Sequence, residues 1–249
     1  MGSRSRIEWT GATWNPLIGC TKYSAGCENC YAERIALMLQ RQGKPDYKNG
    51  FALNLLPERL EVPLHWKKPR VVFVNSMSDL FHDDVPLAFI RRVFDIMNRA
   101  DWHMYQVLTK RSARMRELTE SGAVVWSEHI WPGVTIEADE YRNRLDDLKA
   151  VKAAHKWLSL EPLIAPVRRL DLDGIDWVIT CGESGNNARP MNIDWVRDIR
   201  DWTHRQGKAF FFKKYSERDF KDAADRPALL DGELYKEWPE IKSGALSLF

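Results

Sequence analysis

Short apolar runs that end in polar residues recur along this chain, and this repetition limits its possible folds more than any other feature. Six such runs follow residue 70, and most precede a stretch with the spacing of an amphipathic helix. The alternation predicts βα units that build a parallel sheet through right-handed crossovers. The runs cover residues 71–74, 105–108, 134–136, 156–160, 176–180 and 209–212, and a further short strand is expected within 13–18.

Six to seven parallel strands predict an α/β fold, namely a full or partial (βα) barrel. The chain has 249 residues, of which 44% are hydrophobic, so it can bury one sizeable core and we expect one domain over 1–249. Residues 43–70 contain several prolines and glycines and form a long excursion, which we expect to cover the strand ends. Residues 215–249 are expected to form an irregular C-terminal tail.

The charge balance and hydropathy exclude some classes of partner. With 37 basic and 35 acidic residues the net charge is only +2, so a nucleic-acid partner would need a local basic patch. No apolar run approaches the roughly 20 residues that span a bilayer, and no secretory signal is visible. We therefore expect a cytoplasmic protein without a membrane partner, and the sequence does not indicate an oligomeric state.

Three of the four cysteines lie close together, at Cys20, Cys27 and Cys30, with the spacing C-x6-C-x2-C. In a reducing compartment such a group favours metal binding over disulfide formation, and Gly26 allows the loop to fold around one centre. Three cysteines suit an iron–sulfur cluster. The spacing also leaves open a structural zinc ion, with Cys181 or a histidine as fourth ligand, or three unligated thiols.

Several longer segments carry a resemblance that covers nearly the whole chain. They resemble a phage-associated three-cysteine protein family that is itself similar to radical S-adenosylmethionine enzymes. The segments are Ile7-Glu8-Trp9-Thr10, Ala12-Thr13-Trp14-Asn15-Pro16, Gly19-Cys20-Thr21, Cys27-Glu28-Asn29-Cys30-Tyr31-Ala32-Glu33, Phe73-Val74-Asn75-Ser76-Met77-Ser78-Asp79-Leu80-Phe81, Leu108-Thr109-Lys110-Arg111, Trp131-Pro132-Gly133-Val134-Thr135, Leu158-Ser159-Leu160-Glu161-Pro162-Leu163, Gly182-Glu183-Ser184-Gly185, Ala188-Arg189-Pro190-Met191 and Phe210-Phe211-Phe212-Lys213.

The resemblance implies a barrel of the radical S-adenosylmethionine type, with a [4Fe-4S] cluster on Cys20, Cys27 and Cys30. One iron would remain open to bind S-adenosylmethionine, and one electron would cleave that cofactor to methionine and a deoxyadenosyl radical. A reducing protein such as flavodoxin or ferredoxin would supply the electron. The phage association, with Trp9 and Trp14 near the cysteines, points to a nucleotide or nucleic-acid substrate. The usual motif of those enzymes is C-x3-C-x2-C, so the first gap is longer here.

Polar residues at the strand ends are expected to converge, because the C-terminal ends of parallel strands share one face of a barrel. The resemblance places Asp79 where the amino group of the cofactor would bind, since an ammonium needs an acidic acceptor. A helix cap is the alternative role for Asp79, and structural ion pairs are the alternative for the other strand-end acids. The candidate cofactor-binding residues are Tyr31, Ser76, Ser78, Asp79, Thr109, Lys110, Thr135, Glu137, Ser159 and Glu161.

Cys181 and Glu183 are the candidate catalytic residues. They belong to a glycine-flanked turn after an apolar run, where backbone N–H groups can approach a ligand closely. Cys181 is a candidate to donate or quench a hydrogen atom. The alternatives are a buried thiol that only packs and an ordinary tight turn.

Two other classes of function compete with the radical enzyme. In a divalent-metal-dependent hydrolase or nuclease, Asp79, Glu137, Glu161 and Glu183 would hold the metal ions, and the cysteines would bind a structural zinc ion. In a nucleic-acid-binding module, zinc would organise the fold. The nearly neutral net charge disfavours that module.

Overall fold

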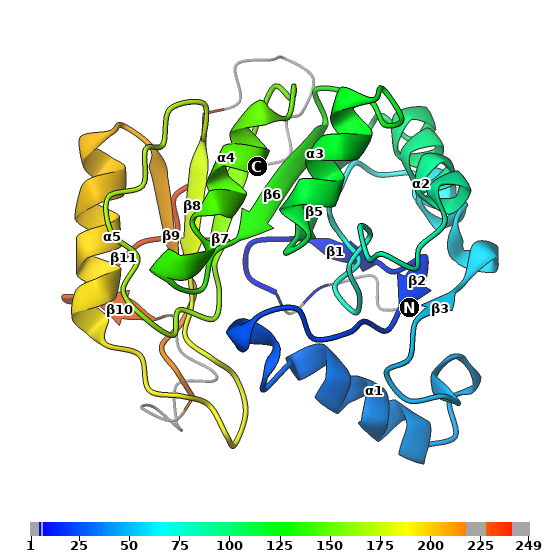
Figure 1. The fold of residues 1–249 in the computed structure, drawn as a ribbon, viewed down its shortest axis with the longest axis horizontal. Helices are drawn as coiled ribbons and strands as arrows, with labels where there is room; N and C mark the ends of the chain where they lie inside the picture. Colours follow the sequence, from blue (N-terminus) through cyan, green and yellow to red (C-terminus); the bar gives the residue numbers. More distant parts are fainter. Residues whose placement is uncertain (1–4, 6, 218–227, 241–249) are drawn as a thin grey trace.

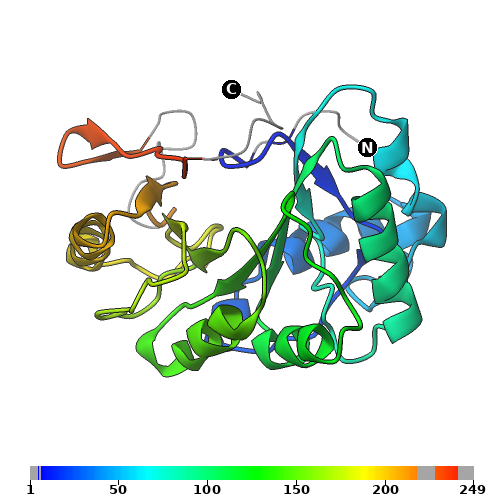
Figure 2. The same cartoon turned by 90° about the horizontal axis from the view of Figure 1, so that it is seen from above.

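The computed structural model describes residues 5, 7–217 and 228–240, and its centre is a seven-stranded parallel sheet. The strand order is β1-β4-β5-β6-β7-β8-β9, so neighbours in space follow one another along the chain. The sheet curls into a half-barrel (Figures 1 and 2), which confirms the predicted partial (βα) barrel. Its strands are β1 (Ala12–Trp14), β4 (Val71–Val74), β5 (Met104–Thr109), β6 (Ile130–Thr135), β7 (Trp157–Leu160), β8 (Trp177–Thr180) and β9 (Ala209–Phe212).

All six strands predicted after residue 70 are present, and the first strand differs from its prediction. One strand was expected within 13–18, but the chain turns at Asn15-Pro16 and forms two separate strands. β1 joins the parallel sheet beside β4, whereas β2 (Leu17–Ile18) pairs antiparallel with β3 (Asn54–Leu55). Pro16 has no N–H to donate to a ladder, which favours the break at this position.

Four helices cover the convex side of the sheet, and a fifth lies apart from them (Figures 1 and 2). The covering helices are α2 (Leu87–Arg99), α3 (Ser112–Glu120), α4 (Asn143–Ala150) and α5 (Ile193–Arg205), while α1 (Tyr31–Arg41) directly follows the three clustered cysteines. The sequence did not predict α3, because this short helix buries few apolar side chains. No helix among the described residues is both long and apolar enough to cross a membrane.

Alternate residues of each strand face opposite sides of the half-barrel. In β4, Val72 and Val74 belong to the core under the helices, whereas Val71 and Phe73 belong to a second cluster. That cluster fills the concave side with aromatic rings contributed by Trp9, Phe73, Trp131, Trp157, Trp177 and Phe211. The concave side of the strands is therefore packed, with Gln106 of β5 as a buried polar residue that donates to Trp9 O, and most polar residues follow at the C-terminal ends.

The excursion 43–70 packs against α1 and the β1 edge of the sheet. Tyr47 and Leu56 share a small core with Ala32 and Ala36 of α1, and the indole of Trp14 donates to Arg59 O at 2.8 Å. Within the expected irregular tail, β10 (Leu229–Leu230) and β11 (Glu233–Leu234) form a short hairpin. The rest of that prediction, for 218–227 and 241–249, lies outside the described residues.

Candidate metal centre at the strand ends

The three clustered cysteines lie in a loop between β2 and α1, beside the C-terminal end of β4. Gly19 pairs with Ser78 after β4, and Cys20 N donates to Phe51 O at 3.1 Å. Cys20, Cys27 and Cys30 are half-buried and none forms a disulfide. We call residues 20–30 the cysteine loop, and its anchors on the strand ends define the site.

The first anchor is the buried pair of Arg111 and Asp79, which follow β5 and β4. Asp79 accepts hydrogen bonds from Thr109 Oγ1 at 2.7 Å and from the Lys110 and Phe81 amides. Arg111 Nη1 donates to Asp79 Oδ2 at 3.2 Å. With four donors around it, the Asp79 carboxylate positions Arg111 and is not left free for a cofactor ammonium. It caps a local turn at Phe81 rather than a helix, because α2 begins only at Leu87.

Glu137 forms the second anchor and is fully buried after β6. Its carboxylate accepts from Ser24 Oγ at 2.6 Å, contacts Lys110 Nζ at 3.0 Å and accepts from Arg144 Nη1 at 2.8 Å. Burial opposes ionisation, but the two cations and the Ser24 hydroxyl hold the pKa of Glu137 below its usual value. A Cβ on Gly26 would lie 2.5 Å from Glu137 Cγ, so only glycine fits against this side chain.

The third anchor is the ion pair between Glu183 and Arg189, after β8. Arg189 donates to both carboxylate oxygens, at 2.5 and 3.0 Å, and Asn29 Nδ2 donates to Glu183 Oε2 at 3.0 Å. Arg189 also reaches the cysteine loop, at Ala25 O and the Glu28 carboxylate. Burial opposes ionisation of Glu183, but its bonds to Arg189 keep its pKa low. Glu183 thus holds the loop and is committed to an ion pair.

A fourth ion pair lies at the ends of β7 and β9, where Lys213 Nζ contacts Glu161 Oε1 at 2.5 Å. Tyr31 and Cys181 are electrostatic neighbours of this pair. Although burial alone would lower the pKa of Lys213, Glu161 raises it. Burial raises the pKa of the Cys181 thiol, so this fully buried group keeps its proton. The Tyr31 hydroxyl donates to Ser76 O at 2.5 Å, and because Tyr31 directly follows Cys30, this bond links the cysteine loop to the end of β4.

The remaining predicted residues lie at the same end of the sheet. Ser76 Oγ bonds the Asn15 side chain, and Ser78 Oγ donates to Leu17 O at 2.9 Å, so both hydroxyls hold the turn after β4. Thr135 and Ser159 are buried and lie opposite each other in β6 and β7. The structure therefore places every predicted strand-end residue at one end of the sheet. Most of these side chains form hydrogen bonds or ion pairs with other residues of the protein.

Other residues of this site were not among the candidates chosen from the sequence, including Arg144, Lys213 and Asn75. Arg144 reaches Glu137 from α4, and Lys213 directly follows β9, a position that the strand-end rule would have selected. Asn75, directly after β4, is buried and has a left-handed φ of 62°. Neither its Oδ1 nor its Nδ2 has a hydrogen-bond partner among the described residues. A buried amide without partners offers one acceptor and one donor to a bound molecule.

In the part of the chain that the structure describes, the three cysteines of the loop are not gathered as ligands of a single metal ion, and no other three His, Cys, Asp or Glu side chains are either. Cys27 is nevertheless an electrostatic neighbour of both Cys20 and Cys30. Burial raises the pKa of Cys20 to about 11, so metal binding there must displace a proton.

Two other sets proposed from the sequence do not assemble. Among the described residues, Cys181 is not grouped with the other cysteines as a set of metal ligands, so it is not placed as a fourth zinc ligand. The four strand-end acids each contact a cation of their own instead of one another. This arrangement does not offer a carboxylate set for divalent ions.

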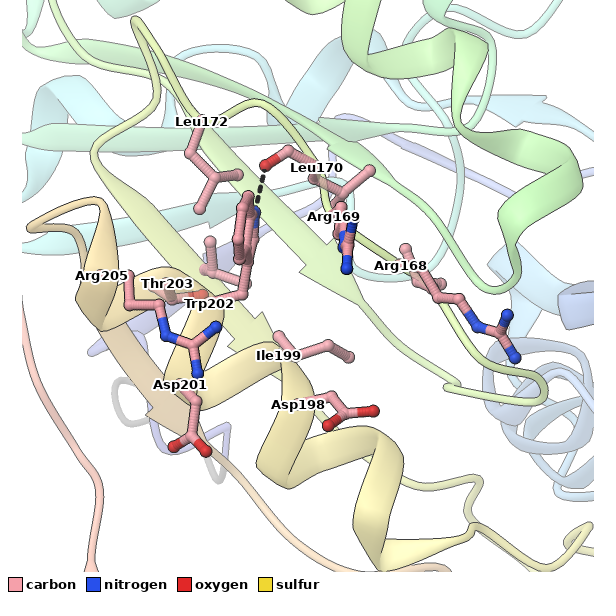
Figure 3. A pocket seen from close by; sticks show the side chains of 12 residues that line it. Arg168, Arg169, Leu170, Leu172, Asp198, Ile199, Asp201, Trp202, Thr203 and Arg205 are labelled. Atoms are coloured by element: carbon pink, nitrogen blue, oxygen red, sulfur yellow. Dashed lines mark hydrogen bonds between the residues drawn. The ribbon is translucent and has the colours of Figure 1, made fainter.

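The structure also has a cavity of about 310 Å³ outside this site, on the convex side (Figure 3). It lies between the β7–β8 connection, which contains no α-helix, and α5. Val178 and Ile199 contribute to its apolar wall, and the indole of Trp202 donates to Leu170 O at 2.6 Å. None of the predicted site residues lines this cavity. A second hollow, of about 410 Å³, opens beside Tyr23 and Arg111.

Comparison with known proteins yields one match. Searches among curated proteins and among solved structures found none. One family model matches residues 4–239, and its description is "Protein of unknown function (DUF5131)". Since the match covers nearly the whole chain, including the cysteine loop and all its anchors, this protein belongs to the DUF5131 family.

Proposed function

We propose that this protein is a radical S-adenosylmethionine enzyme with a [4Fe-4S] cluster on Cys20, Cys27 and Cys30. One observation carries the proposal: three ion pairs with buried carboxylates fix the three-cysteine loop beside the C-terminal ends of a parallel half-barrel. Catalytic sites of (βα) barrels lie at that end of the sheet. Loop anchoring of this kind positions ligands for chemistry, whereas a zinc ion that only stabilised the fold would need four converging donors.

When bound, the cluster supplies one electron that cleaves S-adenosylmethionine to methionine and a deoxyadenosyl radical. The protein positions the reactants and limits access of water. Asn75 offers a side-chain amide without a partner among the described residues, and Glu161 with Lys213 offers an ion pair whose two side chains are both partly exposed. These groups are available to bind the cofactor or the substrate.

In the same proposal Cys181 is the hydrogen-atom donor. It is fully buried, keeps its proton and neighbours the Glu161–Lys213 pair. Transfer of its hydrogen atom to a substrate carbon radical would break the S–H bond, form a C–H bond and leave a thiyl radical, which one electron from the external reductant and one proton from solvent would return to the thiol. The substrate class, a nucleotide or nucleic acid, derives from the resemblance to the phage-associated family. Trp9 and Trp14 are buried in packed clusters and so add no support for base stacking.

The test is anaerobic purification and reconstitution, followed by analysis of iron, zinc and acid-labile sulfide. We expect iron and sulfide, with a charge-transfer absorption band that bleaches on reduction. Reductant and S-adenosylmethionine should then release deoxyadenosine. Cys27→Ala should abolish both cluster and release, whereas the matched variant Cys181→Ala should keep the iron content. Stoichiometric zinc without sulfide would show that the proposal is wrong, as would deoxyadenosine release by Cys27→Ala.

A further inference from the structure

Arg111 differs from the other cations around the cysteine loop because it contacts a cysteine sulfur. Its Nη1 donates to Cys20 Sγ at 3.5 Å and to Asp79 Oδ2 at 3.2 Å. Its Nη2 donates to Thr21 Oγ1 at 3.0 Å, and its guanidinium stacks on the Tyr23 ring at 4.8 Å. The side chain is only 3% exposed, so water screens its charge weakly.

Such a contact affects a bound cluster in a defined direction. Hydrogen bonds to the ligand sulfurs and the net charge nearby help to set the reduction potential of an iron–sulfur cluster. Reduction adds negative charge, so a cation bonded to a ligand sulfur favours the reduced form. Asp79 carries a negative charge and accepts from the same Nη1 as Cys20 Sγ, so it opposes that effect.

We infer that Arg111 raises the reduction potential of the cluster through Cys20, and that Asp79 limits this effect. The inference rests on the proposed function and adds a positioning pair that tunes electron uptake. A simple loop anchor would behave differently. Either substitution breaks the same ion pair and would disturb a mere anchor in the same way, whereas electrostatic tuning predicts opposite shifts.

The experiment is a redox titration of the reconstituted full chain, followed by electron paramagnetic resonance. In Arg111→Gln, we expect the ratio of reduced to oxidised cluster at a fixed potential to fall about tenfold, which is 59 mV for a one-electron couple. In Asp79→Asn, the ratio should rise. Arg114→Gln is the matched control: Arg114 lies in α3, the helix that directly follows Arg111, and it bonds backbone carbonyls such as Val85 O and contacts no cysteine. It should leave the potential unchanged.

Arg111→Lys keeps the measurement decisive if one of the other variants does not fold. Lysine keeps the charge but has no planar fork that reaches Cys20, Asp79 and Thr21 together. We expect a shift in the direction of Arg111→Gln that is smaller than half of it. Unchanged reduction potentials, or shifts of the same sign for Arg111→Gln and Asp79→Asn, would overturn the inference. The proposed function would still stand if the wild-type protein binds the cluster. A wild-type protein without iron and sulfide would overturn both.

Discussion

Replacement of Gly26 by alanine tests the packing of the cysteine loop on Glu137. The new Cβ would lie 2.5 Å from both Cγ and Oε1 of Glu137, far inside ordinary contact distance. Glu137 has little room to move, because Ser24, Lys110 and Arg144 hold its carboxylate. The loop must therefore shift, or the buried ion pairs must break.

The expected cost follows from this geometry. Overpacking a well-packed site costs about 1–3 kcal/mol, and alanine recovers about 0.4–1 kcal/mol because it restricts the unfolded chain. We take a net loss of about 1.5 kcal/mol. For a chain of this size each kcal/mol lowers Tm by about 2–4 °C, so Tm should fall by about 3–6 °C.

Thermal unfolding of the metal-free protein, followed by circular dichroism, measures this shift, and iron content after reconstitution should fall with it. Gly11→Ala is the matched control. Neither glycine has a left-handed φ, and a Cβ on Gly11 would meet Val71 O at 3.4 Å and Val71 N at 4.0 Å, both ordinary contact distances. Equal Tm values for Gly26→Ala, Gly11→Ala and the wild-type protein would refute the proposed contact.

Three further predictions concern other parts of the site. Since the folded pKa of Glu137 lies below its unfolded value near 4.3, its stabilising effect is complete above that pH and is lost as the pH falls through the folded pKa. Glu137→Gln should therefore flatten the fall of Tm between about pH 5 and 3, and an unchanged slope would contradict this. Asn75→Gly breaks no side-chain hydrogen bond seen among the described residues, and glycine tolerates the left-handed φ of 62°, so Tm should change little. Because the amide is lost, affinity for S-adenosylmethionine should fall about tenfold in equilibrium dialysis. The reverse pattern would count against a ligand-binding role. Tyr31→Phe removes the bond to Ser76 O and should lower the free energy of unfolding by about 1 kcal/mol in urea titrations; no loss would exclude a stabilising bond.

Much of the sheet could be predicted from local patterns. Runs such as 71–74 and 209–212 are short and continuously apolar, as strands covered on both faces require. The cysteine spacing and the polar strand ends were equally visible. Prediction failed where local signals were weak or conflicting: α3 has a polar sequence, and Pro16 divides an apolar stretch that otherwise reads as one strand.

The sequence by itself determined the parallel α/β architecture, the cysteine loop and the end of the sheet at which polar groups collect. Each of these depends on neighbouring residues or on the order of elements along the chain. Only the tertiary structure decided which charges meet. Ser24 and Glu137 are 113 positions apart, and Arg111 reaches Cys20 across 91. Such contacts depend on the curl of the sheet and on the lengths of the crossovers, so no periodicity within a short segment encodes them. Through these contacts the acids of the three anchors hold the cysteine loop and are not free to bind a ligand.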